Sequence, residues 1–259
     1  MVVVTRSGPV HASAATAVEL TLARGARPVV AAATFTIPVG AVTALIGPNG
    51  AGKSTVLDAI AGLLPPDRGT LEVPAWGRPG GVAYVLQGTS ANQQLPITVR
   101  EAVTMGRYAT AGLLGRLGRS DRAAIDAAMD AVALGPLAHR PLRDLSGGER
   151  QRAFVAQALA QQADVLLLDE PITALDVVSR QHILDAVAAE RAAGRAVVVS
   201  THDLADAAAA DHLLLLAGRV VASGPPADVL TEDNLAGAYG GHLLRVGEGT
   251  LILDDHPHH

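Results

Sequence analysis

One nine-residue stretch constrains the fold of this chain more than any other. Residues 47–55 read Gly-Pro-Asn-Gly-Ala-Gly-Lys-Ser-Thr and fit the pattern G-x-x-x-x-G-K-[ST]. The apolar run at 41–46 predicts a strand before the pattern, and Ser54 to Ala61 predicts a helix after it. Glycines let the backbone curl so that successive N–H groups point inward at phosphate oxygens, and a helix N-terminus adds partial positive charge. The sequence therefore predicts a nucleotide-binding α/β domain.

The same loop predicts which side chains hold the phosphates. Lys53 can reach the β- and γ-phosphates of a nucleoside triphosphate, and the Ser54 hydroxyl can ligate Mg²⁺. Lys53 is also the only lysine among the 20 basic side chains. We expect the whole loop to line the nucleotide site, namely Gly47, Pro48, Asn49, Gly50, Ala51, Gly52, Lys53, Ser54 and Thr55.

Composition narrows the class of protein further. With 259 residues, 49% hydrophobic and 17% charged, the chain can bury one large domain with an inserted subdomain. A net charge of −5 and the lack of any basic run longer than two residues argue against a nucleic-acid partner. The uncharged stretch 28–52 is interrupted by Pro38-Val39-Gly40 and by the glycine-rich loop, so it does not predict a membrane-spanning helix. No secretory leader is expected, and zero cysteines exclude disulfides.

The order of predicted elements favours a sheet that is mainly parallel. Strands are predicted at 18–22, 29–37, 69–73 and 82–86, helices alone at 99–160, and strands again at 164–168, 196–200, 213–216 and 219–222. The expected fold class is α/β: a P-loop NTPase core with flanking helices, an antiparallel β edge and an inserted helical subdomain. The expected organisation is a flexible tail at 1–14, one domain at 15–245 with its helical subdomain at about 89–162, and a polar, histidine-containing tail at 246–259.

Two further stretches carry chemistry. Asp169 and Glu170 follow the apolar run 165–168, which places carboxylates at the carboxyl edge of the sheet. Asp169 can hold Mg²⁺, and Glu170 is the candidate general base for an attacking water. Ser146-Gly147-Gly148-Glu149 precedes a predicted helix and forms a second nest of N–H groups suited to a γ-phosphate. One nucleotide does not need two nests from one chain, so we expect a two-fold dimer in which each chain offers its second nest to its partner's nucleotide.

The ordered set of motifs resembles the ATPases of ATP-binding-cassette (ABC) transporters. It covers residues 16–225 and comprises the phosphate loop, Gln87, Leu145 to Glu149, Leu168 to Glu170, Ala174-Leu175-Asp176 and His202. The resemblance implies that ATP and Mg²⁺ are the cofactors and that Gln87 joins Mg²⁺ to the attacking water. It also implies that Asp176 lies in a loop crossing the dimer interface. His202 would contact the γ-phosphate and hold Glu170 and the water in place.

One position departs from the family pattern. An aromatic residue commonly stacks on adenine from the first turn of such ATPases, and the matching position here is Arg24. A guanidinium plane can also stack on a base. We therefore expect Arg24 to contact ATP, with weaker nucleotide binding than a tyrosine would give.

The resemblance also implies a role in transport. The segment from Gln87 to Tyr108 and the stretch 160–164 are similar to those of zinc and manganese importers, and siderophore, haem and cobalamin importers share much of this form. The chain would then energise uptake of a metal ion, zinc before manganese, through separate polytopic membrane subunits and, indirectly, an extracytoplasmic solute-binding protein. It would sit peripherally on the cytoplasmic face of the membrane. A soluble ABC ATPase outside transport is the alternative from another class. The terminal histidines could bind metal weakly, but a tail without function is the preferred interpretation.

Overall fold

The computed structural model describes residues 13–86, 96–112, 115–240, 243–246 and 250–253. Its centre is a six-stranded sheet in the order β5-β6-β7-β3-β8-β9. The strands are β3 (Val42–Ile46), β5 (Val82–Val85), β6 (Val165–Asp169), β7 (Ala196–Ser200), β8 (His212–Leu216) and β9 (Val220–Gly224). All neighbouring pairs are parallel except β8 and β9. The predicted fold class is confirmed.

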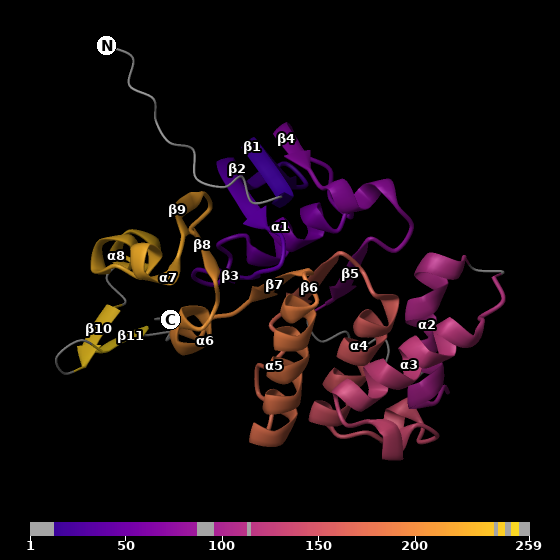
Figure 1. Ribbon diagram of the computed structural model, residues 1–259. Helices are drawn as coiled ribbons and strands as arrows, with labels where there is room; N and C mark the ends of the chain where they lie inside the picture. The colour runs from indigo at the N-terminus through magenta and orange to yellow at the C-terminus, as the bar shows by residue number, and fades with distance from the viewer. Residues whose placement is uncertain (1–12, 87–95, 113–114, 241–242, 247–249, 254–259) are drawn as a thin grey trace, which may run out of the picture.

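A smaller antiparallel sheet forms the β edge in the order β2-β1-β4. Its strands are β1 (Ser13–Arg24), β2 (Arg27–Pro38) and β4 (Arg68–Glu72), followed by a 3₁₀ turn at Pro74–Gly77. The first helix, α1 (Lys53–Ile60), lies between this sheet and the central one (Figure 1). One buried cluster joins α1 and β1 to the Val165 and Leu167 side chains of β6.

Between β5 and β6 the described chain is helical. It contains α2 (Val99–Ala111), α3 (Arg119–Ala131), α4 (Gly147–Gln161) and 3₁₀ turns at Gly135–Leu137 and Leu142–Asp144. These helices pack together beside α5 (Val177–Ala192) (Figure 1). They bury the face of β6 that carries Leu166 and Leu168. Because helices cover one face of β6 and α1 with the small sheet the other, the strand is apolar throughout, as parallel strands usually are.

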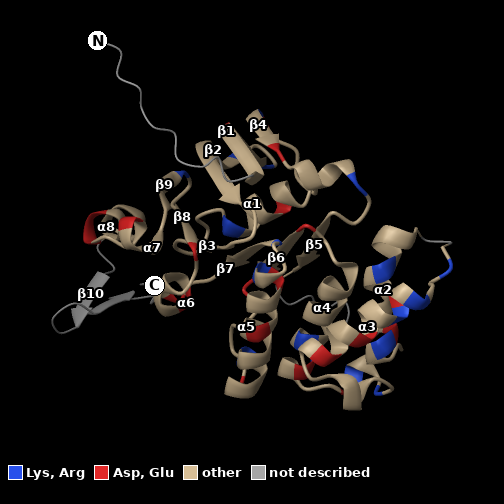
Figure 2. Cartoon of the chain, in the orientation of Figure 1, with Lys and Arg blue, Asp and Glu red and all other residues tan. Residues whose placement is uncertain are grey.

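Close helix packing and paired charges hold this insert together. A Cβ at Gly106 of α2 would lie 2.0 Å from the Gln157 oxygen of α4, so only glycine permits this approach. Arg107, 12% exposed, pairs with Asp121 of α3 at 2.8 Å and donates to the Ala160 oxygen at 2.9 Å. Basic and acidic side chains interleave over the insert (Figure 2), which agrees with the absence of a basic run in the sequence.

The C-terminal part covers the far side of the central sheet. Helices α6 (Leu204–Ala208), α7 (Pro226–Val229) and α8 (Glu232–Tyr239) enclose a third cluster with β3 and β8. Strands β10 (Leu243–Val246) and β11 (Thr250–Leu253) pair as an antiparallel hairpin. No helix of the described residues is both long and apolar enough to cross a bilayer.

Two boundaries and three short helices differ from the expectations. Strand β1 begins at Ser13, inside the predicted tail 1–14, because its register shifts four times and hides the two-residue alternation. The hairpin β10–β11 spans the domain boundary predicted at 245, and β11 lies within the segment predicted as a polar tail. Helices α6 to α8 were not predicted, since each has only four to eight residues. The terminal histidines and most of the predicted N-terminal tail lie outside the described residues.

Candidate active site

The phosphate loop connects the carboxyl end of β3 to α1, and two of its glycines are required by close contacts. Gly47 has φ +147°, and a Cβ there would lie 2.1 Å from the backbone oxygen of Leu216 on β8. Gly52 has φ +104° and forms the N-cap of α1, where a Cβ would lie 2.4 Å from a Val30 methyl group. The loop is therefore wedged between β8 and β2, which fixes the direction in which its N–H groups point.

Lys53 is held inside this loop. Its side chain is 8% exposed, and Nζ donates to the carbonyl oxygen of Gly47 at 2.7 Å and of Pro48 at 3.2 Å. The ammonium group thus lies over the first turn of the loop, where the phosphates of a nucleotide are expected.

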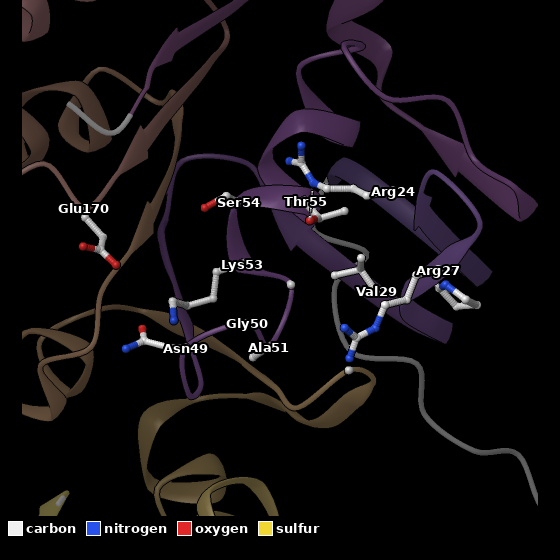
Figure 3. Close-up of a pocket in the computed structure, with 13 residues that line it drawn as sticks. Arg24, Arg27, Val29, Asn49, Gly50, Ala51, Lys53, Ser54, Thr55 and Glu170 are labelled. Atoms are coloured by element: carbon white, nitrogen blue, oxygen red, sulfur yellow. Dashed lines mark hydrogen bonds between the residues drawn. The ribbon is translucent and has the colours of Figure 1, made fainter. Parts of the chain in front are cut away.

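A pocket of about 710 Å³ opens beside the loop. It is lined by Arg24, Arg27, Pro28, Val29, Asn49, Gly50, Ala51, Gly52, Lys53, Ser54, Thr55, Glu170 and Gly218. Glu170 lies on the opposite side of Lys53 from Arg24 and Arg27 (Figure 3). Seven of the nine predicted loop residues line the pocket; Gly47 and Pro48 contribute the carbonyl groups that hold Lys53.

The two carboxylates at the end of β6 are positioned by a serine that the sequence analysis did not single out. Asp169 is 3% exposed, and the Ser200 hydroxyl donates to its Oδ1 at 2.5 Å. The same Ser200 oxygen accepts the backbone N–H of Glu170 at 2.8 Å. Asp169 and Ser200 end neighbouring parallel strands in register. The sequence does contain one signal for Ser200, because this serine comes directly after the apolar run 196–199.

Glu170 leaves the strand in a strained conformation. Its φ is +47°, in the left-handed region that non-glycine residues seldom adopt. The turn aims its half-buried side chain into the pocket, where the Thr173 hydroxyl lies 3.5 Å from Oε2. Such strain, fixed by Ser200 on the backbone side, is typical of functional positions.

Arg24 is anchored to α1. Its Nε donates to the Thr55 hydroxyl at 3.2 Å, and its guanidinium forms an ion pair with Asp58. The side chain is still 55% exposed and lines the pocket. Four further lining residues, Arg27, Pro28, Val29 and Gly218, were not predicted, because only the fold brings the β1–β2 turn and the β8–β9 turn to the loop.

The Ser-Gly-Gly motif lies at the start of α4 and does not line the pocket of its own chain. Ser146 caps the helix: its Oγ accepts the Glu149 N–H at 3.2 Å, and Glu149 Oε2 accepts the Ser146 N–H at 2.8 Å. That backbone hydrogen bond holds the pKa of Glu149 below its usual range. Ser146 and Gly147 are exposed, so the nest faces outward.

Asp176 is close to this motif. It caps α5 by accepting the Ser179 N–H at 2.9 Å, and this hydrogen bond lowers the pKa of Asp176. A Cβ at Gly148 would lie 2.7 Å from Asp176 Oδ2 and 2.6 Å from Ser179 Oγ. The lack of a side chain at Gly148 therefore lets the starts of α4 and α5 pack against each other.

His202 and Gln87 are the remaining residues predicted for the hydrolytic site. His202 follows β7 two residues after Ser200 and is exposed; like Asp169, it is not among the lining residues. Gln87 comes directly after the described residue Leu86 at the end of β5 and itself lies outside the described residues.

The oxygen groups at this edge suit Mg²⁺. Ser54 lines the pocket, and the Asp169 carboxylate ends β6; hydroxyl and carboxylate oxygens are the ligands that this hard cation prefers. Within the described ranges no group of three or more His, Cys, Asp or Glu could hold a metal.

Comparison with known proteins connects this geometry to a family. A model described as ABC transporter matches residues 30–173. The zinc transport system ATP-binding protein TroB of Treponema pallidum is 40% identical over 87% of this chain and 86% of its own length. The manganese transport system ATP-binding protein MntB of Bacillus subtilis is 36% identical over 90% and 94%. The hemin import ATP-binding protein HmuV of Streptomyces coelicolor is 42% identical over 83% and 79%.

The likeness extends to three dimensions. A solved inward-facing ABC transporter, assigned to the metal-chelate type, superposes with a TM-score of 0.77 at 29% identity, covering 88% of this chain and 89% of that one. The family match spans more than half of the chain, and the similarity to TroB at 40% identity extends over 87% of it. This chain therefore belongs to the ABC transporter family and is an ATP-hydrolysing subunit of that family.

Proposed function

We propose that the chain energises the import of a metal ion, zinc before manganese, through separate membrane subunits. The observation that carries this proposal is the similarity, along nearly the whole chain, to ATP-binding proteins named for zinc and for manganese transport. The segment from Gln87 to Tyr108, similar to that of metal importers, supports the same conclusion. The membrane subunits receive the motion from the cytoplasmic side, and a solute-binding protein outside the membrane delivers the ion to them.

The motor is a dimer that closes on two ATP molecules. The outward-facing nest at Ser146 and Gly147 supports this, because it can serve only a nucleotide held elsewhere. The start of α5 adds an apolar surface beside it: Val177 is 83% exposed and Val178 63%. Such exposed valines next to Asp176 are expected where a second copy packs.

Hydrolysis needs a base on one side of the γ-phosphate and positive charge on the other. Glu170 accepts a proton from the attacking water, and Lys53 stabilises the negative charge that develops on the phosphoryl oxygens. Ser54 and Asp169, together with Gln87, would hold Mg²⁺, which would supply positive charge to offset the negative charge of the phosphates. The partner's nest and His202 complete the site on closure.

A second cargo class has its own observation. The hemin import protein is 42% identical, so the ATPase of a haem, siderophore or cobalamin importer is the alternative. A soluble ABC ATPase outside transport is the alternative of another class. The first alternative differs from the main proposal in the transported cargo, and the second differs in the partner that the ATPase acts on. Both retain the same ATP hydrolysis.

Uptake measurements test the proposal. Cells that lack the chain are complemented with the parent or with Glu170→Gln, and uptake of ⁶⁵Zn, ⁵⁴Mn, ferric chelates and haemin is followed. We expect ⁶⁵Zn uptake to return with the parent alone. Return of haemin or ferric chelate uptake instead would move the cargo to the alternative class. If no uptake changes and no polytopic membrane protein co-purifies with the chain, the transport role is wrong.

A further inference from the structure

Helices α5 and α6 are joined by an ion pair close to the carboxyl edge of the central sheet. Arg180, in the first turn of α5, pairs with the Asp206 carboxylate of α6. The Asp206 side chain is only 14% exposed. Within the part of the chain that the structure describes, Arg180 has no second ion-pair partner, and its buried Nε has no hydrogen-bond partner. Asp206 is therefore the group that fixes the Arg180 side chain.

The two helices lie beside each other but pack into different parts of the core (Figure 1). Ile183 and Val187 of α5 belong to the cluster shared with the helical insert, whereas Ala207 of α6 belongs to the cluster over β3 and β8. A cavity of about 50 Å³ lies between α5 and the sheet, and Asp206 lines it. Because side chains do not fill this space, apolar packing connects α5 to α6 only weakly here, and the ion pair bridges them.

Each of the two helices begins at a residue expected to act in hydrolysis or next to one. Asp176 is the N-cap of α5, and its backbone oxygen accepts the Arg180 N–H at 2.9 Å. His202 directly precedes Asp203, the N-cap of α6, whose Oδ1 accepts the Ala205 N–H at 2.7 Å. Since α6 has only five residues, it is too short to be stable by itself, and its contacts set where His202 lies.

The charges around Asp206 favour a role other than stability for this ion pair. Burial and the neighbouring Asp203 carboxylate raise the pKa of Asp206, and the charges of Arg180 and His202 offset this only in part. The ionised carboxylate is therefore less favourable in the folded chain than in water. An ion pair of this kind adds little to stability, but it fixes which groups meet and in what orientation.

We propose that the Arg180–Asp206 ion pair positions His202 for hydrolysis by tying α6 to the start of α5, where Asp176 lies. Neither residue lines the nucleotide pocket, so both act through His202 and are positioning residues. This inference rests on the proposed role of His202 in hydrolysis and adds to it the pair that holds the histidine in place.

Steady-state ATPase kinetics and equilibrium ATP binding of the purified full-length chain test this proposal. Asp206→Asn and Arg180→Met each remove the ion pair with little change in shape. Each should lower kcat roughly five- to ten-fold while ATP affinity stays unchanged, because a catalytic group is misplaced and no nucleotide contact is lost. The double variant should lose no more than either single variant, because removing one partner already breaks the pair. Arg180→Lys should keep most of the parent rate, because its ammonium group can still pair with Asp206.

A His202→Ala background separates positioning from mere support of the fold. There Asp206→Asn should cause no further loss of kcat, because residues that act as a unit are not additive. Arg191→Met is the matched control, since this arginine pairs with Asp211 from the other end of α5. Its loss should leave kcat unchanged.

The proposal is overturned if Asp206→Asn and Arg180→Met, shown by circular dichroism to be folded, both keep the parent kcat. It is equally overturned if Asp206→Asn lowers kcat by the same factor with His202 and without it. Failure of the proposed role of His202 looks different, because His202→Ala alone would then hydrolyse ATP at the parent rate, and the positioning role would fall with it.

Discussion

Replacing Ser200 by alanine removes the group that ties the two carboxylates of the site together. Ser200 is fully buried, donates to Asp169 at 2.5 Å and accepts the Glu170 N–H at 2.8 Å. Alanine fits the space but leaves a buried carboxylate oxygen and a backbone N–H without this partner. A hydrogen bond to a charged group contributes about 1.5–3 kcal/mol and an unsatisfied buried donor costs about 1–3 kcal/mol, so we expect the free energy of unfolding to fall by about 2–4 kcal/mol.

The same substitution should lower turnover. Glu170 would lose the hydrogen bond that fixes its backbone, and misplacement of a catalytic group by a fraction of an ångström reduces kcat; we expect a loss on the order of ten-fold. ATP affinity should stay the same, because Ser200 is not among the pocket-lining residues. The defect should therefore lie in kcat and not in KM.

Urea unfolding followed by circular dichroism, together with steady-state ATPase kinetics, measures both effects. The exposed Ser120 of α3 provides the control, and Ser120→Ala should change the free energy of unfolding by less than about 0.5 kcal/mol. An unchanged urea midpoint for Ser200→Ala would refute the reasoning about burial. A stability loss with an unchanged kcat would show that Ser200 supports the fold without positioning Glu170.

Three other perturbations have expected outcomes. Glu170→Gln should keep ATP affinity, lower kcat by roughly 10²–10⁴-fold and accumulate an ATP-dependent dimer in light scattering. Lys53→Ala should instead lose nucleotide affinity. A Glu170→Gln variant as fast as the parent would show that another group is the base. Thr43→Val should raise the free energy of unfolding by about 1 kcal/mol, because the fully buried Thr43 hydroxyl has no hydrogen-bond partner among the described residues; a lower melting temperature would contradict this. Burial lowers the pKa of His212, so the unfolded chain binds more protons and stability should fall as pH drops below about 6.5. His212→Gln should flatten that dependence while the exposed His139→Gln should not, and equal slopes in all three proteins would rule His212 out.

The fold class could be predicted because its signals are local or periodic. The apolar runs before Lys53 and before Asp169 are long enough to be read as buried strands, and the run of helical patterns from 99 to 160 contains no competing strand. The prediction was less accurate where short elements depend on their neighbours. Helices α6 to α8 are stabilised by packing over β3 and β8, and β1 changes register repeatedly, so neither leaves a clear pattern in the sequence.

Within the site, the sequence by itself determined the motifs that are built from a few consecutive residues. The phosphate loop, the acid pair after β6 and the cap of α4 each occupy a few adjacent residues, and the pattern of glycines and polar side chains specifies their geometry. Only the tertiary structure decided which distant groups meet. Ser200 reaches Asp169 from a neighbouring strand 31 residues away, and Arg24 is held by α1, 34 residues on. Such contacts arise from strand order and layer packing, which no local pattern encodes. The phosphate loop and the acid pair could therefore be recognised from the sequence, whereas the contacts of Ser200 and Arg24 could not.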